Sequence, residues 1–300
     1  MAEKFKIAGL GEILWDIYDD GRFIGGAPAN FAAHIAQSGH QAYLFSRVGD
    51  DEPGHRAMES LNALHVNTSG VQTDIFQSTG SVKISLDAQG NPHYSCSTNV
   101  AFDDMRVDSS WEELAPQMQA VFFGLIAQRN ETSRDAMRQF LSMAESALKI
   151  FDVNIRNWDA ATEQKVKDSL EVADVIKMNQ VELSILKQGY QSDLDDVLFL
   201  QDMLERHHLK MAALTLGQHG CCLVTENETE FDPGYFITPV DTTGAGDAFA
   251  AAMVVKYLQN APLAEIADAA NSLAAFVSLQ KGAVPRWSWR QLQEIMVTNL

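Results

Sequence analysis

The chain has 300 residues, of which 46% are hydrophobic and 21% charged, a composition typical of a globular enzyme. Its 40 acidic residues outnumber the 22 Lys and Arg and leave a formal net charge of −18, with no Lys/Arg-rich run. This balance disfavours nucleic acid and acidic membrane surfaces as partners, because both bind clustered positive charge.

The cysteine content predicts a reducing compartment. Cys96, Cys221 and Cys222 are too few for a disulfide framework, and the adjacent pair lacks the C-x-x-C spacing of a redox or zinc site. Residues 1–12 do not form a secretory signal, and the longest uncharged run, 23–46, contains glycine, proline and polar residues that exclude a membrane span. We therefore expect a cytoplasmic protein.

Short apolar runs alternate with segments of helical period, a pattern that indicates βαβ units around a largely parallel sheet. In the first half the pattern predicts strands at 5–11, 41–48 and 121–124 and helices at 28–38, 54–64 and 133–148. In the second half it predicts strands at 149–153, 175–178 and 211–216 and helices at 245–259, 263–279 and 288–297. Trp287 and Trp289 are expected to pack the last helix onto the body of the protein.

One stretch departs from this alternation. Val82, Ile84 and Leu86 alternate with polar residues, and the chain then turns and resumes an extended pattern as far as residue 97. This pattern predicts a β-hairpin with one apolar face. We expect a single α/β domain over 1–300 with a small β-sheet lid formed by excursions at about 13–24 and 72–104.

The strongest chemical signal is Asp241-Thr-Thr-Gly-Ala-Gly-Asp-Ala-Phe249. Its glycines immediately precede a helical run, where backbone N–H groups and the helix dipole favour an anion. Asp247 in this turn could take a proton from an attacking hydroxyl group, although a glycine turn with an acid is also an ordinary helix start. No Gly-Lys dipeptide is present for a Walker A loop, and Phe249 stands where a dinucleotide fingerprint needs its third glycine.

The sequence resembles the ribokinase-like (PfkB) carbohydrate kinases at both ends. The 241–249 segment is similar to the family's C-terminal signature, and Gly25-Gly-Ala-Pro-Ala-Asn30 is similar to its Gly-Gly-x-x-x-Asn sugar-binding signature. Between them, Asp152-Val-Asn-Ile-Arg156 is similar to the Asp-x-Asn-x-Arg element of fructokinases. The resemblance implies a ribokinase-like, three-layer α/β fold with a mainly parallel central sheet.

This resemblance also implies an ATP-dependent sugar kinase. Asp247 would accept the proton of a sugar hydroxymethyl group, and the N–H groups of Gly244, Ala245 and Gly246 would form the anion hole. The residues implied to bind the sugar are Asp16, Gly25, Gly26, Asn30, Phe102, Asn154 and Arg156. Those implied to bind the nucleotide are Asn179, Thr215, Gly217, Gly220 and Asn271.

Two metal sites are implied in the same way. Asn179-x-x-Glu182 matches the family motif that holds Mg²⁺, through waters because Mg²⁺ dehydrates reluctantly. The same spacing is that of a helix cap, and both interpretations can hold at once. Asp241, with backbone carbonyls around Thr243 and Gly282, matches the family position of a K⁺ ion.

The Asp-x-Asn-x-Arg element favours fructose as the substrate. Fructokinases commonly carry an Arg after the lid hairpin, and residues 95–104 contain none, so ribose, 2-keto-3-deoxygluconate and nucleosides remain alternatives. A sugar-sensing relative without catalysis is a further alternative, which the intact Asp247 disfavours. The apolar face of the hairpin predicts a homodimer in which the lids pack together.

Overall fold

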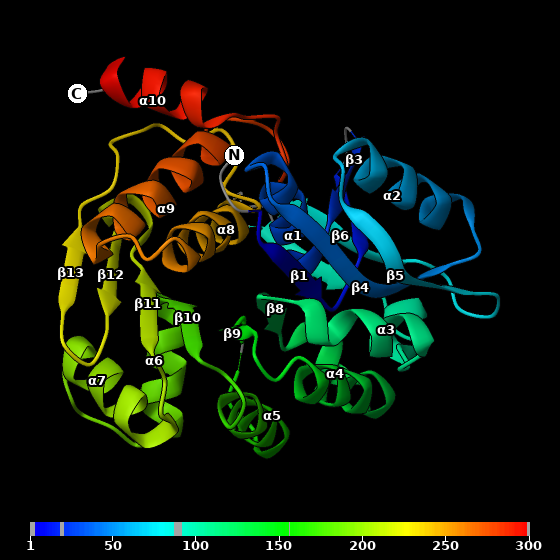
Figure 1. The fold of residues 1–300 in the computed structure, drawn as a ribbon, viewed down its shortest axis with the longest axis horizontal. Coiled ribbons are helices and arrows are strands. Elements are labelled where there is room, and N and C mark those ends of the chain that lie inside the picture. The colour runs from blue at the N-terminus through cyan, green and yellow to red at the C-terminus, as the bar shows by residue number, and fades with distance from the viewer. Residues whose placement is uncertain (1–3, 19–20, 87–91, 156, 299–300) are drawn as a thin grey trace.

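A nine-stranded sheet forms the centre of the protein in the computed structural model, which describes residues 4–18, 21–86, 92–155 and 157–298 (Figure 1). Its strand order is β13-β12-β11-β10-β9-β8-β1-β4-β5, and only β12 and β13 run antiparallel to their neighbours. The strands are β1 (Lys6–Leu10), β4 (Gln41–Gly49), β5 (Asn67–Asp74), β8 (Ala120–Gly124), β9 (Leu148–Asp152), β10 (Val175–Asn179), β11 (Met211–Thr215), β12 (Cys221–Val224) and β13 (Thr229–Asp232). The prediction of a mainly parallel sheet is confirmed.

Helices cover both faces of this sheet (Figure 1). One face carries α1 (Ala27–Gln37), α2 (Glu52–Ala63), α8 (Ala245–Leu258) and α9 (Leu263–Ser278), and α10 (Trp289–Thr298) packs outside α9. The other face carries α3 (Ser109–Leu114), α4 (Glu131–Met143), α5 (Ala160–Leu170), α6 (Gln180–Gly189) and α7 (Asp196–His207). None of the helices in these described ranges combines the length and apolar character needed to cross a bilayer.

Each parallel strand contributes to two hydrophobic cores, because alternate side chains point to opposite faces of a sheet. In β1, Ile7 is buried on the α1 side, whereas Ala8 and Leu10 are buried on the α4 side. In β8, Phe122 stacks on Phe31 of α1 with ring centroids 4.5 Å apart. The apolar runs of the sequence are therefore continuous because both faces of the sheet are covered.

A second sheet forms the lid. Its order is β3-β2-β6-β7, built from β2 (Leu14–Tyr18), β3 (Gly21–Gly25), β6 (Gly80–Leu86) and β7 (Pro92–Cys96). The predicted hairpin is the antiparallel β6–β7 pair, and the extended segment after β1 folds into β2 and β3 and pairs with β6. The lid thus connects segments far apart in sequence at one edge of the central sheet.

The prediction of one helix over 133–148 is wrong at its C-terminal end. Helix α4 ends at Met143, and Leu148 begins β9 by pairing with Ala120 of β8. Leu148 fits the helical period, but its place in the sheet overrides local propensity because it fills a buried strand position. Strand β5 was not predicted, since it is largely polar and lies at the edge of the sheet.

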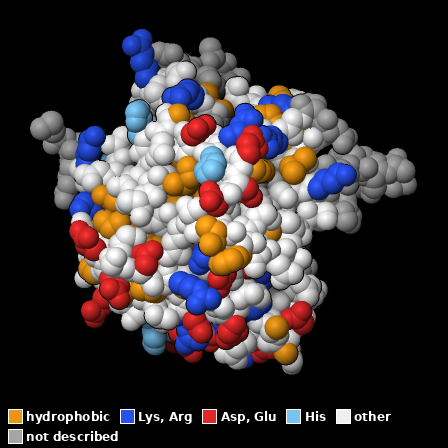
Figure 2. All heavy atoms as spheres, turned by 90° about the vertical axis from the view of Figure 1, so that its right-hand side faces the viewer, with side chains coloured by type: hydrophobic (Ala, Val, Ile, Leu, Met, Phe, Trp, Pro, Cys, Tyr) orange, Lys and Arg blue, Asp and Glu red, His pale blue; other side chains and the backbone are white. Residues whose placement is uncertain are grey.

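Charged side chains of both signs cover the face that carries α2 and β5 (Figure 2). Short ion pairs account for several of them, such as Arg22 with Glu52 at 2.7 Å and Arg56 with Glu52 at 3.2 Å. Such exposed pairs add little to stability. The chemistry-bearing motifs lie elsewhere, at the carboxyl ends of the parallel strands, where α/β sheets bind ligands.

Candidate active site

Asp247 lies in the first turn of α8, directly after the glycine turn. Its Oδ2 accepts a hydrogen bond of 2.9 Å from Nδ2 of Asn30 on α1. Burial raises the pKa of Asp247 to about 7, Asp152 raises it further, and Lys177 and the Asn30 hydrogen bond oppose the increase. The carboxyl therefore changes its charge close to neutral pH, which suits a group that accepts a proton at that pH.

Four of the seven predicted sugar-binding residues, Asp16, Gly25, Gly26 and Asn30, lie on the lid side of Asp247. Asp16 on β2 is 9% exposed and lies so close to Gly25 that a Cβ there would be 2.3 Å from its Oδ2. Gly26 has a φ of +99°, and a Cβ on it would be 2.4 Å from the Glu12 carbonyl, so only glycine fits this turn. Burial, then the charge of Asp241, raises the pKa of Asp16 to about 6.

Asn30 has an unused acceptor in this site. It is 3% exposed, its Nδ2 is bound to Asp247, and its Oδ1 is buried without a hydrogen-bond partner among the described residues. A buried polar atom without a partner is unfavourable, so a donor group that reaches Asn30 Oδ1 would be stabilising there. A sugar hydroxyl that donates to Asn30 Oδ1 would satisfy it, and would lie next to the carboxyl of Asp247.

The glycine turn before α8 is closely packed from two sides. Gly244 has a φ of +77°, and a Cβ on it would lie 2.5 Å from the Cβ of Ala283. On the other side, a Cβ on Gly246 would lie 2.9 Å from Nζ of Lys177. The turn thus combines the N-terminus of a 14-residue helix with a nearby ammonium group, an environment that favours an anion.

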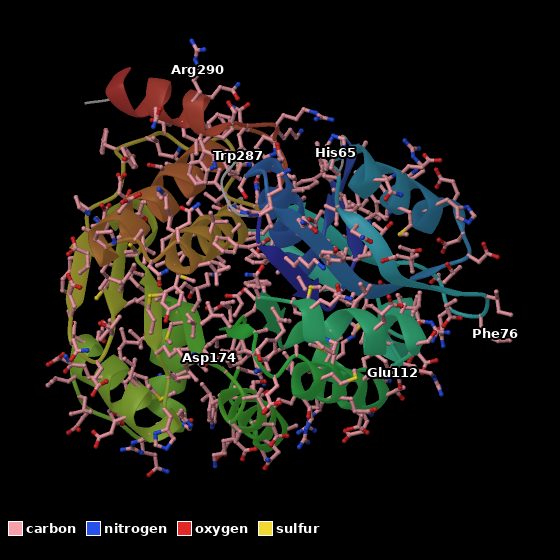
Figure 3. All side chains as sticks on the ribbon, in the orientation of Figure 1. His65, Phe76, Glu112, Asp174, Trp287 and Arg290 are labelled. Carbon is pink, nitrogen blue, oxygen red and sulfur yellow. The ribbon has the colours of Figure 1, made fainter. Side chains whose placement is uncertain are left out.

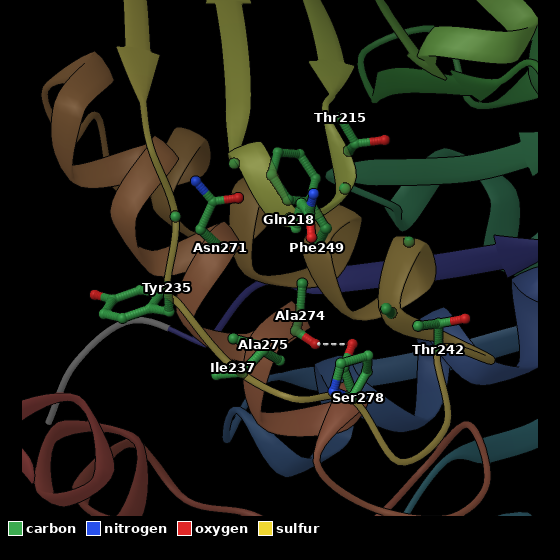
Figure 4. Close-up of a pocket in the computed structure, with 16 residues that line it drawn as sticks. Thr215, Gln218, Tyr235, Ile237, Thr242, Phe249, Asn271, Ala274, Ala275 and Ser278 are labelled. Carbon is green, nitrogen blue, oxygen red and sulfur yellow. Dashed lines mark hydrogen bonds between the residues drawn. The ribbon is translucent and has the colours of Figure 1, made fainter. Parts of the chain in front are cut away.

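A cavity of about 250 Å³ adjoins this turn and includes Ala245 and Gly246 in its wall (Figure 4). Four of the predicted nucleotide residues line it: Thr215, Gly217, Gly220 and Asn271. Apolar lining residues missed by the sequence analysis are Ile237, Pro239, Phe249, Ala274 and Ala275. The combination of an apolar wall with a few polar groups suits a flat aromatic base joined to a polar chain.

Asn271 is fixed within this cavity by a strand on its wall. Its Nδ2 donates to Oδ1 of Asp232 at 2.7 Å, and its oxygen points into the cavity (Figure 4). The fifth predicted nucleotide residue, Asn179, is paired with Thr215 across β10 and β11. It therefore lies next to the cavity although it does not line it.

Asn179 and Glu182 form a reciprocal helix cap. Asn179 Oδ1 accepts from the Glu182 N–H, and Glu182 Oε2 accepts from the Asn179 N–H, each at 2.9 Å. Among the described residues, no group of three or more His, Cys, Asp or Glu side chains could hold a metal ion directly. The oxygen donors of this cap fit Mg²⁺ bound through waters, since such an ion needs acceptors for its water shell rather than a protein cage.

Asp241 joins the two segments predicted to surround K⁺. Its Oδ1 accepts from the Thr243 N–H at 2.9 Å, and its Oδ2 accepts from the Gly282 N–H at 3.0 Å. The structure thereby brings all three predicted residues together. Oxygen donors from a carboxylate and backbone carbonyls are suitable for a hard monovalent cation.

The lid contacts this same corner. The Tyr18 hydroxyl of β2 lies 3.0 Å from Thr243 Oγ1, and the ring of Phe23 on β3 packs on Gly282. Tyr18 and Phe23 also meet edge to face, with ring centroids 5.7 Å apart. The small sheet therefore packs against the segment that leads into the glycine turn.

Three predicted sugar residues are not placed in the pocket by described contacts. Phe102 is fully buried between Gly80 and the guanidinium of Arg129, which fits a residue that shapes the wall of the pocket, and its contact with the sugar stays a prediction. Asn154 follows β9 with a φ of +43°, without a described contact to the other site residues. Arg156 lies outside the described residues.

The side chain of Arg129 lies against residues 97–103, within the segment 95–104 that contains no arginine of its own. It comes from a short helical turn after β8 and donates to both carboxylate oxygens of Asp103, at 2.6 and 2.8 Å. It also donates to the Ser97 carbonyl at 2.7 Å. The segment after the lid hairpin thus receives its guanidinium from another part of the chain, which no local pattern could predict.

A buried charged cluster that the sequence did not predict lies beneath the glycine turn. Lys177 Nζ donates to Asp152 Oδ1 at 2.8 Å, and both side chains are under 10% exposed. Nearby Glu12 is 2% exposed, and burial raises its pKa to about 8. A lysine within the apolar strand β10 was the available signal, since a charged residue in a buried strand needs a partner.

Comparisons with known proteins agree with this architecture. Residues 19–290 match the pfkB family of carbohydrate kinases. An uncharacterised sugar kinase of Pyrococcus horikoshii is 32% identical over 312 residues, covering 97% of this chain and 94% of its own. Its crystal structure superposes with a TM-score of 0.83 over 96% of this chain and 97% of that one, and it has also been solved in complex with ATP.

Two fructokinases are also similar. Fructokinase-1 of Oryza sativa subsp. japonica is 31% identical over 275 residues, covering 87% of this chain and 84% of its own. The fructokinase of Vibrio cholerae, solved with fructose, ADP and calcium, is 25% identical with a TM-score of 0.80, covering 97% of this chain and 98% of that one. The resemblance and the ribokinase-like fold are therefore confirmed, and the chain belongs to the pfkB family of carbohydrate kinases, phosphotransferases that act on an alcohol group.

Proposed function

We propose that this sugar kinase is an ATP-dependent fructokinase. The observation that carries the proposal is the Asn30–Asp247 hydrogen bond, which joins the sugar-binding signature to the glycine turn of α8. It places a carboxyl between the lid-side polar residues and the cavity proposed for ATP. Fructose is favoured over other sugars by the Asp-x-Asn-x-Arg element at 152–156 and by the similarity to the rice and Vibrio fructokinases.

In the proposed reaction, a sugar hydroxymethyl oxygen attacks the γ-phosphorus of ATP. A new O–P bond forms while the bond from the γ-phosphorus to the bridging oxygen breaks, and ADP leaves with that electron pair. Asp247 accepts the hydroxyl proton on Oδ1, because its Oδ2 is already bound to Asn30. The N-terminus of α8 and the ammonium of Lys177 stabilise charge on the transferred group, as phosphoryl transfer requires.

Two ions complete the proposed site. Mg²⁺, held through waters by Asn179 and Glu182, would neutralise phosphate charge when bound. K⁺ would lie at the corner that Asp241 forms with Thr243 and Gly282, next to the glycine turn.

The cellular compartment and the oligomeric state are proposals as well. The three cysteines, none of them in a disulfide, fit a reducing cytoplasm. A dimer through the lid also stays a proposal, supported by the exposed Ile17 on β2.

The pKa of Asp247 predicts how the rate depends on pH. Because a base acts only when ionised, kcat/KM should fall about tenfold for each pH unit below about 7, the value to which burial raises this pKa. Initial rates at subsaturating sugar and fixed free Mg²⁺, between pH 5 and 9, measure this. A profile that stays flat down to pH 5 would contradict Asp247 as a base with this raised pKa.

The substrate is tested by ADP release from Mg-ATP. We expect the highest kcat/KM with fructose among fructose, ribose, glucose, 2-keto-3-deoxygluconate and adenosine, and a higher rate with K⁺ than with an equal concentration of a bulky organic cation. A preference for another member of the panel would refute the fructose assignment and leave the kinase reaction standing. No turnover on any of them, by protein that binds ATP, would favour the non-catalytic alternative.

A further inference from the structure

His34 is a buried titratable residue that the proposed reaction does not use. It lies on α1, has no exposed surface, and burial lowers its pKa to about 4, so the ring is neutral. Trp287 Nε1–H donates to His34 Nδ1 at 3.0 Å, and the other ring nitrogen, Nε2, lies 3.0 Å from the carbonyl oxygen of Ala283. Because Nδ1 accepts, the proton must be on Nε2, which donates to Ala283.

The Ala283 carbonyl belongs to the backbone that supports the glycine turn. Ala283 packs so closely on Gly244 that a Cβ there would be 2.7 Å from the Ala283 oxygen. The preceding residue, Gly282, donates its N–H to Asp241 at the other end of the turn. The position of residues 282 and 283 therefore controls both ends of the segment that precedes Asp247.

Helix α1 holds this backbone and the catalytic carboxyl at the same time. Asn30 and His34 are four residues apart, so they lie on the same face of the helix. Asn30 binds Asp247, whereas His34 binds Ala283. One turn further, Gln37 donates to the Pro285 carbonyl at 3.2 Å and accepts from the Trp287 N–H at 3.0 Å (Trp287 is labelled in Figure 3).

We propose that His34 is a positioning residue for phosphoryl transfer, which through the Ala283 carbonyl keeps the anion-binding turn aligned with the carboxyl that Asn30 holds. This inference rests on the proposed roles of Asp247 and its glycines. The rate of a transfer reaction is sensitive to small displacements, whereas sugar affinity depends on Asp16, Asn30 and the glycines at 25 and 26. Loss of the His34–Ala283 bond should therefore reduce kcat and leave the sugar KM nearly unchanged.

The test compares two amides at position 34. In His34→Gln the amide nitrogen reaches the position of Nε2 and can still donate to Ala283. In His34→Asn the shorter side chain reaches only the position of Nδ1, so it can meet Trp287 but not Ala283. We expect His34→Asn to lower kcat by about 10- to 100-fold with sugar KM within about threefold, and His34→Gln to stay within about threefold of wild type in kcat.

Trp287→Phe is the matched control for loss of packing. It removes the hydrogen bond to Nδ1 but leaves the bond from Nε2 to Ala283, and it should destabilise the protein while kcat stays within about threefold. All rates are measured with whichever sugar the wild-type enzyme prefers, so the outcome does not depend on fructose, and melting temperatures are recorded in parallel. Equal kcat values for His34→Gln and His34→Asn, or a loss in Trp287→Phe as large as in His34→Asn, would overturn the proposal.

Discussion

Replacing Asp247 with Asn is expected to lower kcat by about 10²–10⁴-fold, the usual contribution of a general base. The asparagine side chain has nearly the same shape, and its amide oxygen can still accept the hydrogen bond from Asn30. The fold and the binding of ATP should therefore be preserved, whereas the proton of the sugar hydroxyl has no acceptor. Steady-state kinetics together with calorimetric ATP binding measure both parts. A variant with kcat within about fivefold of wild type would remove Asp247 from the mechanism.

The stability of the same variant provides a control that does not depend on turnover. The pKa of Asp247 is about 7 in the folded protein and 3.8 ordinarily, so the folded state binds the proton more tightly. The contribution of Asp247 to wild-type stability should therefore decrease as pH rises from about 4 to about 7 and fall no further above that range. Asp247→Asn lacks this titration, and its stability relative to wild type should increase over the same interval. Urea unfolding at several pH values tests this difference.

Continuous motifs made much of this site predictable. Gly244 to Asp247 form a single turn whose proposed anion-binding role follows from local backbone geometry, and the proposed role of the first turn of α1 is local in the same way. The helical periods predicted at 28–38 and 245–259 then placed both motifs at the start of a helix, as the structure shows for α1 and α8. The contact between Asn30 and Asp247 was not itself predictable, because it depends on how α1 and α8 pack side by side on one face of the sheet.

The sequence could not reveal the residues that the fold brings to the site from distant parts of the chain. Phe249 and Ala274 line the cavity proposed for the nucleotide, but in sequence they are indistinguishable from core residues of α8 and α9. Arg129 reaches the segment after the lid from a different part of the chain. The helical period of the sequence also could not predict that α4 ends at Met143, because the pairing of β9 with β8 determines that boundary.

Lys177 is the missed residue with the largest expected effect on stability. Its ammonium is 6% exposed and hydrogen-bonded to Asp152, which is 3% exposed. Burial lowers the pKa of Lys177, but the charges of Asp152, Glu182 and Asp247 outweigh this and raise it overall. The lysine therefore remains charged, and it compensates several acids that burial alone would leave unpaired.

Lys177→Met should destabilise the protein by about 3–5 kcal/mol, because it leaves Asp152 as a buried charge without its partner. Asp152→Asn should also destabilise the protein, because it leaves the Lys177 ammonium as a buried charge without its partner. The double variant should recover most of the lost free energy of unfolding, since it contains neither unpaired charge. Urea unfolding of the four proteins at pH 8 gives the coupling free energy. Strictly additive losses would show that the two side chains do not stabilise each other.

The same variants should move the pH profile in opposite directions. Asp152 raises the pKa of Asp247 and Lys177 lowers it, so kcat/KM should titrate at higher pH in Lys177→Met and at lower pH in Asp152→Asn. A purely structural role for the pair would reduce activity in both variants without separating their profiles. Opposite shifts would instead mean that the buried ion pair of Lys177 and Asp152 sets the pH at which Asp247 becomes ionised. Lys177 would then act on the glycine turn that it contacts at Gly246, although it is distant from that turn in sequence.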